Sequence, residues 1–110
     1  MQVNMEEKSG VSVVRVKGDI DINTSPDIKK SFDSLITDKK DKVVIDFTEV
    51  DYVDSSGLAT LVEILKKLRS YGGKLKLAAL SEKVHGLFEI TKLNKLFDIV
   101  DSESGAINSF

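Results

Sequence analysis

The sequence has no cysteine and no tryptophan, and it contains only one histidine and one proline. Without cysteine there is no disulfide framework, no thiolate metal site and no cysteine nucleophile. The single histidine, His85, excludes a multi-histidine metal site, and its apolar neighbours favour a helix surface over a catalytic triad. We therefore expect a protein that is not an enzyme and that needs no metal and no cofactor.

Long apolar runs are also missing. No stretch approaches the roughly 18 apolar residues of a membrane span, and residues 1–7 lack the basic start and apolar stretch of a secretory signal. Neither a GxxxxGK[ST] nor a GxGxxG motif occurs, so the chain has no nucleotide-binding signature of its own. The balance of 16 basic and 18 acidic residues, net −2, gives no general attraction to nucleic acid. These absences favour a cytoplasmic protein with neither nucleic acid nor membrane as a partner.

Charge is unevenly distributed along the chain. Residues 19–54 contain ten acids and five lysines, whereas residues 66–95 contain eight bases and two acids. Two interpretations are open: solvated faces of a lysine-rich surface, or an oriented surface for a partner. Only two of the 16 basic residues are arginine, which argues against a bidentate phosphate or nucleic-acid code.

The residues that are abundant favour one folded domain. Val, Ile, Leu and Phe together make up 37 of the 110 residues, which excludes intrinsic disorder. The length fits a single domain, and no repeat, low-complexity tract or Pro/Gly-rich linker divides the chain. We expect one domain over residues 1–110.

Apolar periodicity predicts the order β-β-α-β-α-β-α-β-α. A hairpin turn is expected at Ser9-Gly10, a first helix starting at Thr24-Ser25-Pro26-Asp27 with a hydroxyl N-cap, and a buried strand over residues 43–47. A second helix opens near Ser55 with a 3.6-residue apolar period. The alternation predicts an α/β fold with a mixed, largely parallel sheet of about four to five strands and the first two helices on one face.

Two loops are the candidate site, because ligands and modifications favour the carboxyl ends of parallel strands. They cover residues 18–24 and 51–57. If their strands are parallel neighbours, the loops meet and bring Asp21 and Asp54 close to the pair Ser55-Ser56.

The Asp-Ser-Ser-Gly sequence of residues 54–57 allows two interpretations. One is helix capping alone, in which Asp and Ser side chains accept the free N–H groups of the first turn. The other is a serine that is modified or touches a ligand, because two serines and Gly57 are more than a cap requires, and Gly57 leaves the hydroxyls open to a large partner. A magnesium site like that of aspartate-phosphorylated receivers is disfavoured, because Asp46 lies within the apolar run.

The sequence resembles the STAS domain of bacterial anti-sigma factor antagonists over nearly its whole length. The resemblance rests on Gly18-Asp19-Ile20-Asp21 with Thr24, on residues 43–47, and above all on the Val-Asp-Ser-Ser-Gly-Leu sequence of residues 53–58. It continues through the glycine pair at residues 72–73 and through residues 84–90 to 96–99.

The resemblance implies partner switching in transcription regulation. The unphosphorylated antagonist binds an anti-sigma factor that is also a serine kinase, which releases the sigma factor. Phosphorylation of a serine at the start of the second helix ends the complex, and a PP2C-type phosphatase reverses it. The implied acceptor is Ser56, with Ser55 as the alternative. The residues implied to contact the kinase are Asp21, Asn23, Thr24, Asp54, Ser55, Gly57 and Leu58. We expect a monomer when the protein is free. The alternative is a scaffold or ligand-sensing module of the same fold that is never phosphorylated.

Overall fold

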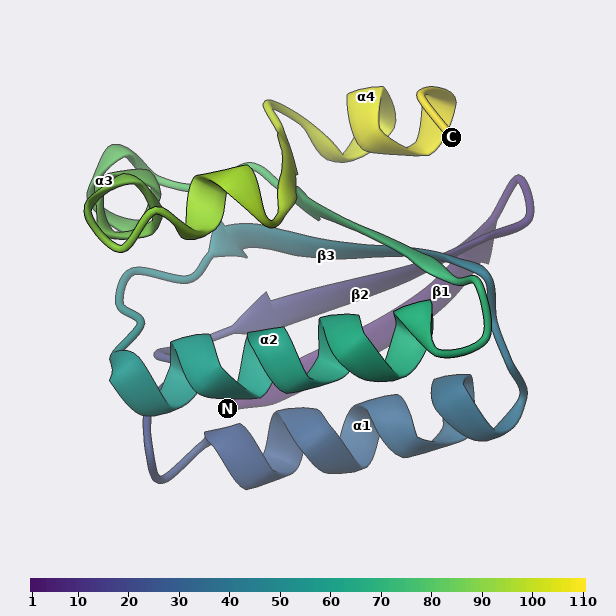
Figure 1. Ribbon diagram of the computed structural model, residues 1–110, viewed down its shortest axis with the longest axis horizontal. Coiled ribbons are helices and arrows are strands. Elements are labelled where there is room, and N and C mark those ends of the chain that lie inside the picture. Colours follow the sequence, from purple (N-terminus) through teal and green to yellow (C-terminus); the bar gives the residue numbers. More distant parts are fainter.

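Five strands form one mixed sheet in which the order in space is the order along the chain, β1-β2-β3-β4-β5 (Figure 1). The computed structural model describes all 110 residues. The strands are β1 (Gln2–Lys8), β2 (Val11–Lys17), β3 (Lys42–Glu49), β4 (Lys74–Ala78) and β5 (Asp98–Val100). The helices are α1 (Ser25–Thr37), α2 (Ser55–Arg69), α3 (Glu82–Ile90), the 3-10 turn η1 (Leu93–Lys95) and α4 (Glu103–Asn108).

The predicted order of elements is confirmed, with η1 as the one element that periodicity did not predict. β1 and β2 are antiparallel and joined by the two-residue turn Ser9-Gly10, in which both residues have positive φ, 52° and 78°. β2, β3, β4 and β5 are then all parallel to their neighbours. The apolar run of residues 43–47 forms the buried part of β3, as predicted.

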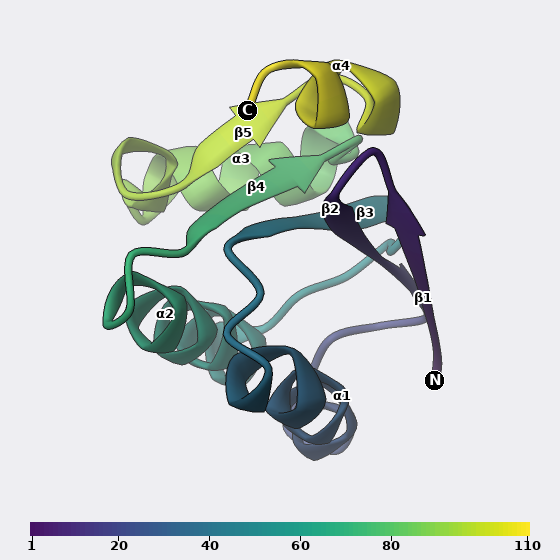
Figure 2. The same ribbon diagram turned by 90° about the vertical axis from the view of Figure 1, so that its right-hand side faces the viewer.

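Three helices cover one face of the sheet, because successive parallel strands are joined by crossovers of the same hand. α1 and α2 lie side by side there, as expected, and α3 covers the end near β4 (Figure 2). This side contains the main core of 21 buried residues, including Phe32, Phe47 and Leu61. Phe88 of α3 packs edge-on against Phe97 just before β5, with ring centroids 5.6 Å apart. No helix has the length and apolarity that a membrane crossing requires.

The short helix α4 lies alone on the opposite face (Figure 2). Its Ala106 packs on a small cluster with Val11, Val13, Val44 and Ala78 from three strands. A six-residue helix buries little apolar surface, so α4 depends strongly on polar anchors.

The main anchor of α4 is a two-pronged ion pair across the sheet face. The Arg15 guanidinium on β2 donates through Nε and Nη2 to the two carboxylate oxygens of Glu103, at 2.9 and 2.6 Å. These bonds lower the pKa of Glu103 to about 2. Burial raises the pKa of the nearby Asp46 on β3 above its ordinary value.

Candidate functional site

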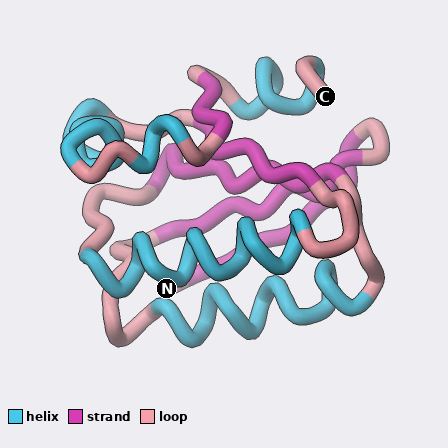
Figure 3. The backbone as a smooth tube through the Cα atoms, viewed as in Figure 1, coloured by secondary structure: helices cyan, strands magenta, loops and turns pink.

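The loops that follow β2 and β3 meet beyond the ends of their strands, as the sequence predicted. Ile20 and Val53 form an isolated parallel bridge. The backbone N–H of Ile20 donates to the Tyr52 carbonyl at 2.9 Å, and that of Asp54 donates to the Ile20 carbonyl at 3.1 Å. Both loops lie at the left end of the molecule in Figure 3. The bridge extends the sheet by one rung and fixes the two loops relative to each other.

Asp54 links the start of α2 to the neighbouring loop. One carboxylate oxygen accepts the Gly57 N–H at 2.9 Å and so caps the helix. The other accepts the Ile22 N–H at 3.3 Å. One aspartate therefore holds both sides of the site.

Asp21 and Thr24 shape the loop after β2. The Asp21 carboxylate accepts the backbone N–H groups of Asn23 and Thr24 at 2.9 and 3.0 Å. The Thr24 hydroxyl accepts from the Asp21 N–H at 2.9 Å and donates to the Asp19 carbonyl at 2.7 Å. The expected hydroxyl cap is therefore wrong. The Thr24 hydroxyl is occupied by the preceding loop and the Ser25 hydroxyl donates to the Asp21 carbonyl, although α1 does begin at Ser25.

Neither serine caps α2, because Asp54 supplies the cap. The hydroxyls of Ser55 and Ser56 form no hydrogen bond with another protein group, and both lie in the first turn of the helix. Ser55 is exposed, and Ser56 is half-buried in a groove between α1 and α2. We call this the serine groove; it has a volume of about 290 Å³ and is lined by Ile22, Ser25, Pro26, Lys29, Ser56, Ala59, Thr60 and Glu63.

An ion pair crosses the serine groove. Lys29 of α1 contacts Glu63 of α2 with a nitrogen–oxygen distance of 2.9 Å, and Lys67 adds a second contact to Glu63 at 3.5 Å. The hydrogen bond from Lys29 holds the pKa of Glu63 below its ordinary value. Ser56 therefore shares its groove with Lys29, whose charge is already paired with Glu63.

Gly57 and Leu58 lie beneath the site and not on its surface. A Cβ atom on Gly57 would lie 2.6 Å from the Ile20 carbonyl oxygen and 2.9 Å from Val53 Cγ1. The missing side chain therefore allows the bridged loops to approach α2, which corrects the expectation that it exposes the serine hydroxyls. Leu58 is 7% exposed and belongs to the main core.

Sequence reasoning missed the exposed apolar side chains of the site loops and of α3. Ile22 is 68% exposed, Tyr52 44% and Ile90 82%, and these are three of the six large exposed hydrophobic residues in the molecule. Tyr52 and Ile90 line a second groove of about 280 Å³ between the loop after β3 and α3. The position of Tyr52 directly before the Val-Asp-Ser-Ser-Gly sequence is the only sequence signal that pointed to this surface.

No group of three or more His, Cys, Asp or Glu side chains is arranged to hold a metal ion. The predicted surface position of His85 is confirmed, since Nδ1 lies 3.1 Å from Glu89 on the outside of α3. What the site presents is two serine hydroxyls, carboxylates bound to backbone N–H groups, and exposed apolar side chains. This combination suits recognition by a protein better than catalysis.

Comparisons with known proteins agree with the fold and with the sequence resemblance. The model of the STAS domain family matches residues 2–106. The anti-sigma-B factor antagonist of Bacillus subtilis is 32% identical over 109 residues, covering 97% of this chain and 99% of that protein. The anti-sigma F factor antagonist of Paenibacillus polymyxa is 29% identical over 108 residues, covering 97% and 92%. The crystal structure of an anti-sigma factor antagonist from Mycobacterium paratuberculosis superposes with a TM-score of 0.89 at 28% identity, covering 98% and 92%.

Proposed function

The chain belongs to the STAS domain family, and from this premise we propose that it is an anti-sigma factor antagonist switched off by phosphorylation of Ser56. The unphosphorylated form binds an anti-sigma factor that is also a serine kinase, and so releases a sigma factor. A PP2C-type phosphatase restores the active form. The protein acts in the cytoplasm as a binding partner, without catalysis of its own.

The observation that carries this proposal is the pair of unengaged hydroxyls at the N-terminus of α2. Because Asp54 caps the helix, replacing a hydroxyl hydrogen by a phosphoryl group breaks no hydrogen bond within the protein. The free N–H groups and the dipole of a helix N-terminus favour an added negative charge. The folded protein can therefore carry the modification without losing its structure.

Ser56 is the better acceptor because it lies in the serine groove between α1 and α2. A phosphoryl group there adds about −1.5 to −2 charge at pH 7. Ser55 is exposed one residue earlier and lines none of the cavities. A partner that covers the groove would be rejected by a phosphate on Ser56 more directly than by one on Ser55.

The surroundings of Ser56 make the switch electrostatic. Asp21 and Asp54 are already at this end of the molecule, their carboxylates held by backbone N–H groups. A third negative group creates a dense acidic surface that a partner shaped for neutral hydroxyls would not tolerate. No change of fold is needed.

The exposed apolar residues supply the attraction that the switch removes. Ile22 lines the serine groove with Ser56, and Tyr52 and Ile90 line the second groove beside the loop after β3. A few buried anchor side chains, tyrosine among the commonest, dominate the binding energy of an interface, and burial of the neighbouring apolar surface adds to it. The unphosphorylated site combines these exposed apolar side chains with neutral hydroxyls.

The test is to incubate the protein with ATP and each anti-sigma kinase from the same genome, then map the phosphate and measure binding by calorimetry. Ser56→Ala should bind the kinase and resist modification. Ser56→Asp should weaken binding tenfold or more, a loss of about 1.4 kcal/mol, while the matched control Ser55→Asp should have a smaller effect. Phosphate on Ser55 would overturn the choice of acceptor. If neither serine is phosphorylated by any of these kinases, the scaffold or ligand-sensing module is favoured instead.

A further inference from the structure

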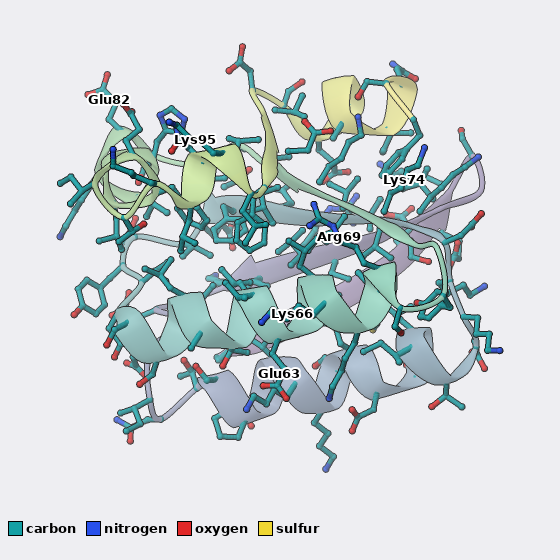
Figure 4. All side chains as sticks on the ribbon, in the orientation of Figure 1. Glu63, Lys66, Arg69, Lys74, Glu82 and Lys95 are labelled. Carbon is teal, nitrogen blue, oxygen red and sulfur yellow. The ribbon has the colours of Figure 1, made fainter.

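We propose that the edge of the molecule beside β5 binds an acidic, extended segment of another protein that inserts an apolar side chain. We call this surface the basic edge; it consists of Arg69, Lys74 and Lys95, which line a cavity between α2 and the segment from η1 to β5, together with Lys66 three residues before Arg69 on α2 (Figure 4). The cavity has a volume of about 410 Å³, the largest of the five in the molecule. The proposal does not depend on the phosphorylation of Ser56.

The cations of the basic edge have no carboxylate partners. None of the four is in an ion pair, and the guanidinium of Arg69 instead donates to the Leu96 carbonyl at 3.2 Å. This bond holds Arg69 across the gap between α2 and η1. The only acidic side chain that lines the cavity, Asp98, is already paired with Lys76 at 3.2 Å. The positive charge at the rim is therefore left for a ligand from outside.

Part of the cavity wall is apolar. Leu96 is 36% exposed and Phe110 is half-buried, whereas Leu65 and Phe97, which also line the cavity, are only 3% and 4% exposed. Lys76 is held in the wall, where its Nζ donates to Ser109 Oγ at 2.8 Å and lies 4.9 Å from the centre of the Phe110 ring. A ligand with one large apolar group could fill the cavity while its acidic groups contact the rim.

The strand β5 adds a reason for an extended ligand. It is an edge strand that pairs only with β4, so one row of its backbone groups has no strand partner. The opposite edge, β1, carries Glu6, Glu7 and Lys8 close together, a mixed-charge arrangement that discourages strand addition. Lys95 lies just before β5 and Lys74 on the neighbouring strand β4, so positive charge gathers near the start of this edge strand and favours an acidic segment there.

The chemistry of the basic edge favours protein over nucleic acid. Three of its four cations are lysines, which lack the bidentate geometry of arginine for phosphate. Neither aromatic ring of the cavity is free for base stacking, because Phe97 is only 4% exposed and the Phe110 ring already faces Lys76 Nζ at 4.9 Å. Carboxylates from an acidic segment need only point charges, which lysines supply.

The test uses a short fluorescent peptide of glutamates with one central leucine, titrated against the whole protein by anisotropy and by NMR of backbone amides. We expect shifts in residues 69–76 and 95–99. The double variant Lys74→Glu/Lys95→Glu should weaken binding at least tenfold. The matched control Lys30→Glu/Lys39→Glu makes the same charge change at two exposed lysines outside the cavity and should have a much smaller effect.

Several results would overturn the proposal. These are equal weakening by the two double variants, shifts centred on the serine groove, or tighter binding of a single-stranded oligonucleotide of the same charge at the same salt concentration. A dimer in sedimentation that Lys74→Glu/Lys95→Glu abolishes would identify a second copy of the chain as the occupant instead. Ser56→Asp should leave peptide binding unchanged, so this test and that of the antagonist function can fail separately.

Discussion

Replacing Gly57 by alanine should destabilise the protein and disturb the site, although the same change usually strengthens a helix. In an unobstructed helix interior, Gly→Ala contributes about 1 kcal/mol of stability. At Gly57 the new Cβ would lie 2.6 Å from the Ile20 carbonyl oxygen, 2.8 Å from Ile20 Cγ2 and 2.9 Å from Val53 Cγ1. Two of these neighbours are side-chain atoms and one is backbone, so the loop itself must move.

The movement has a cost that can be worked out from the bridge. Displacing Ile20 weakens its two backbone hydrogen bonds, to Tyr52 and from Asp54, each worth about 1 kcal/mol. Overpacking of a close contact adds about 1–3 kcal/mol. After subtracting the gain in helix propensity, we expect a net loss of about 2–4 kcal/mol, the lower end of which corresponds to roughly 8–16 °C in Tm for a domain near 100 residues.

Urea unfolding followed by circular dichroism measures this loss, with Gly86→Ala as the matched control. Gly86 also lies within a helix, but a Cβ atom there would have no other atom within 4 Å, so alanine should stabilise the protein by up to about 1 kcal/mol. Opposite signs for the two substitutions support the packing argument. If Gly57→Ala were as stable as the parent, the close approach of the loops to α2 would not be needed and our reasoning would be refuted.

Three further substitutions test the polar contacts. Glu103→Gln should lower the free energy of unfolding at pH 7 by on the order of 2 kcal/mol. Because the pKa of Glu103 is lowered to about 2, its carboxylate stabilises the fold above pH 4.5, and this contribution is lost as the pH falls from 4.5 toward about 2. The variant should not show this loss, and a variant with the same dependence of stability on acid pH as the parent would contradict the assignment. Asp46→Asn should raise the free energy of unfolding at neutral pH. The pKa of Asp46 is raised in the folded state, so ionisation of its carboxyl group destabilises the fold as the pH rises. A Tm below that of the parent at pH 7 would argue against this prediction. Thr24→Val should cost about 1–2 kcal/mol by removing the hydroxyl that joins Asp21 to Asp19, and denaturant unfolding that shows no change would sink that assignment.

Much of the fold follows from local patterns in the sequence. The β-branched run at residues 43–47 and the apolar stripes of α1 and α2 identify the central strand and two of its covering helices. Once the strands alternate with helices, the chirality of crossovers places those helices on one face. The meeting of the two loops follows from the same geometry.

Other features depend on contacts that no local pattern contains. α4 has six residues, too few for a stripe that would reveal its face, and its anchor joins Arg15 to Glu103 across 88 positions of the chain. The Thr24 hydroxyl could cap a helix or bind the loop before it, and only the folded loop decides between these equal local choices. The close packing of Gly57 against Ile20 and Val53 likewise depends on a bridge between residues of different loops.

The neighbour order of the strands has a consequence for how the protein folds. Because each strand pairs with the strand just before it in the chain, every pairing closes a loop no longer than one helix and its connections. Loop-closure entropy is then small at each step, and folding rates rise as contacts become more local. We expect the chain to fold rapidly for an α/β domain, adding one strand at a time to the β1–β2 hairpin.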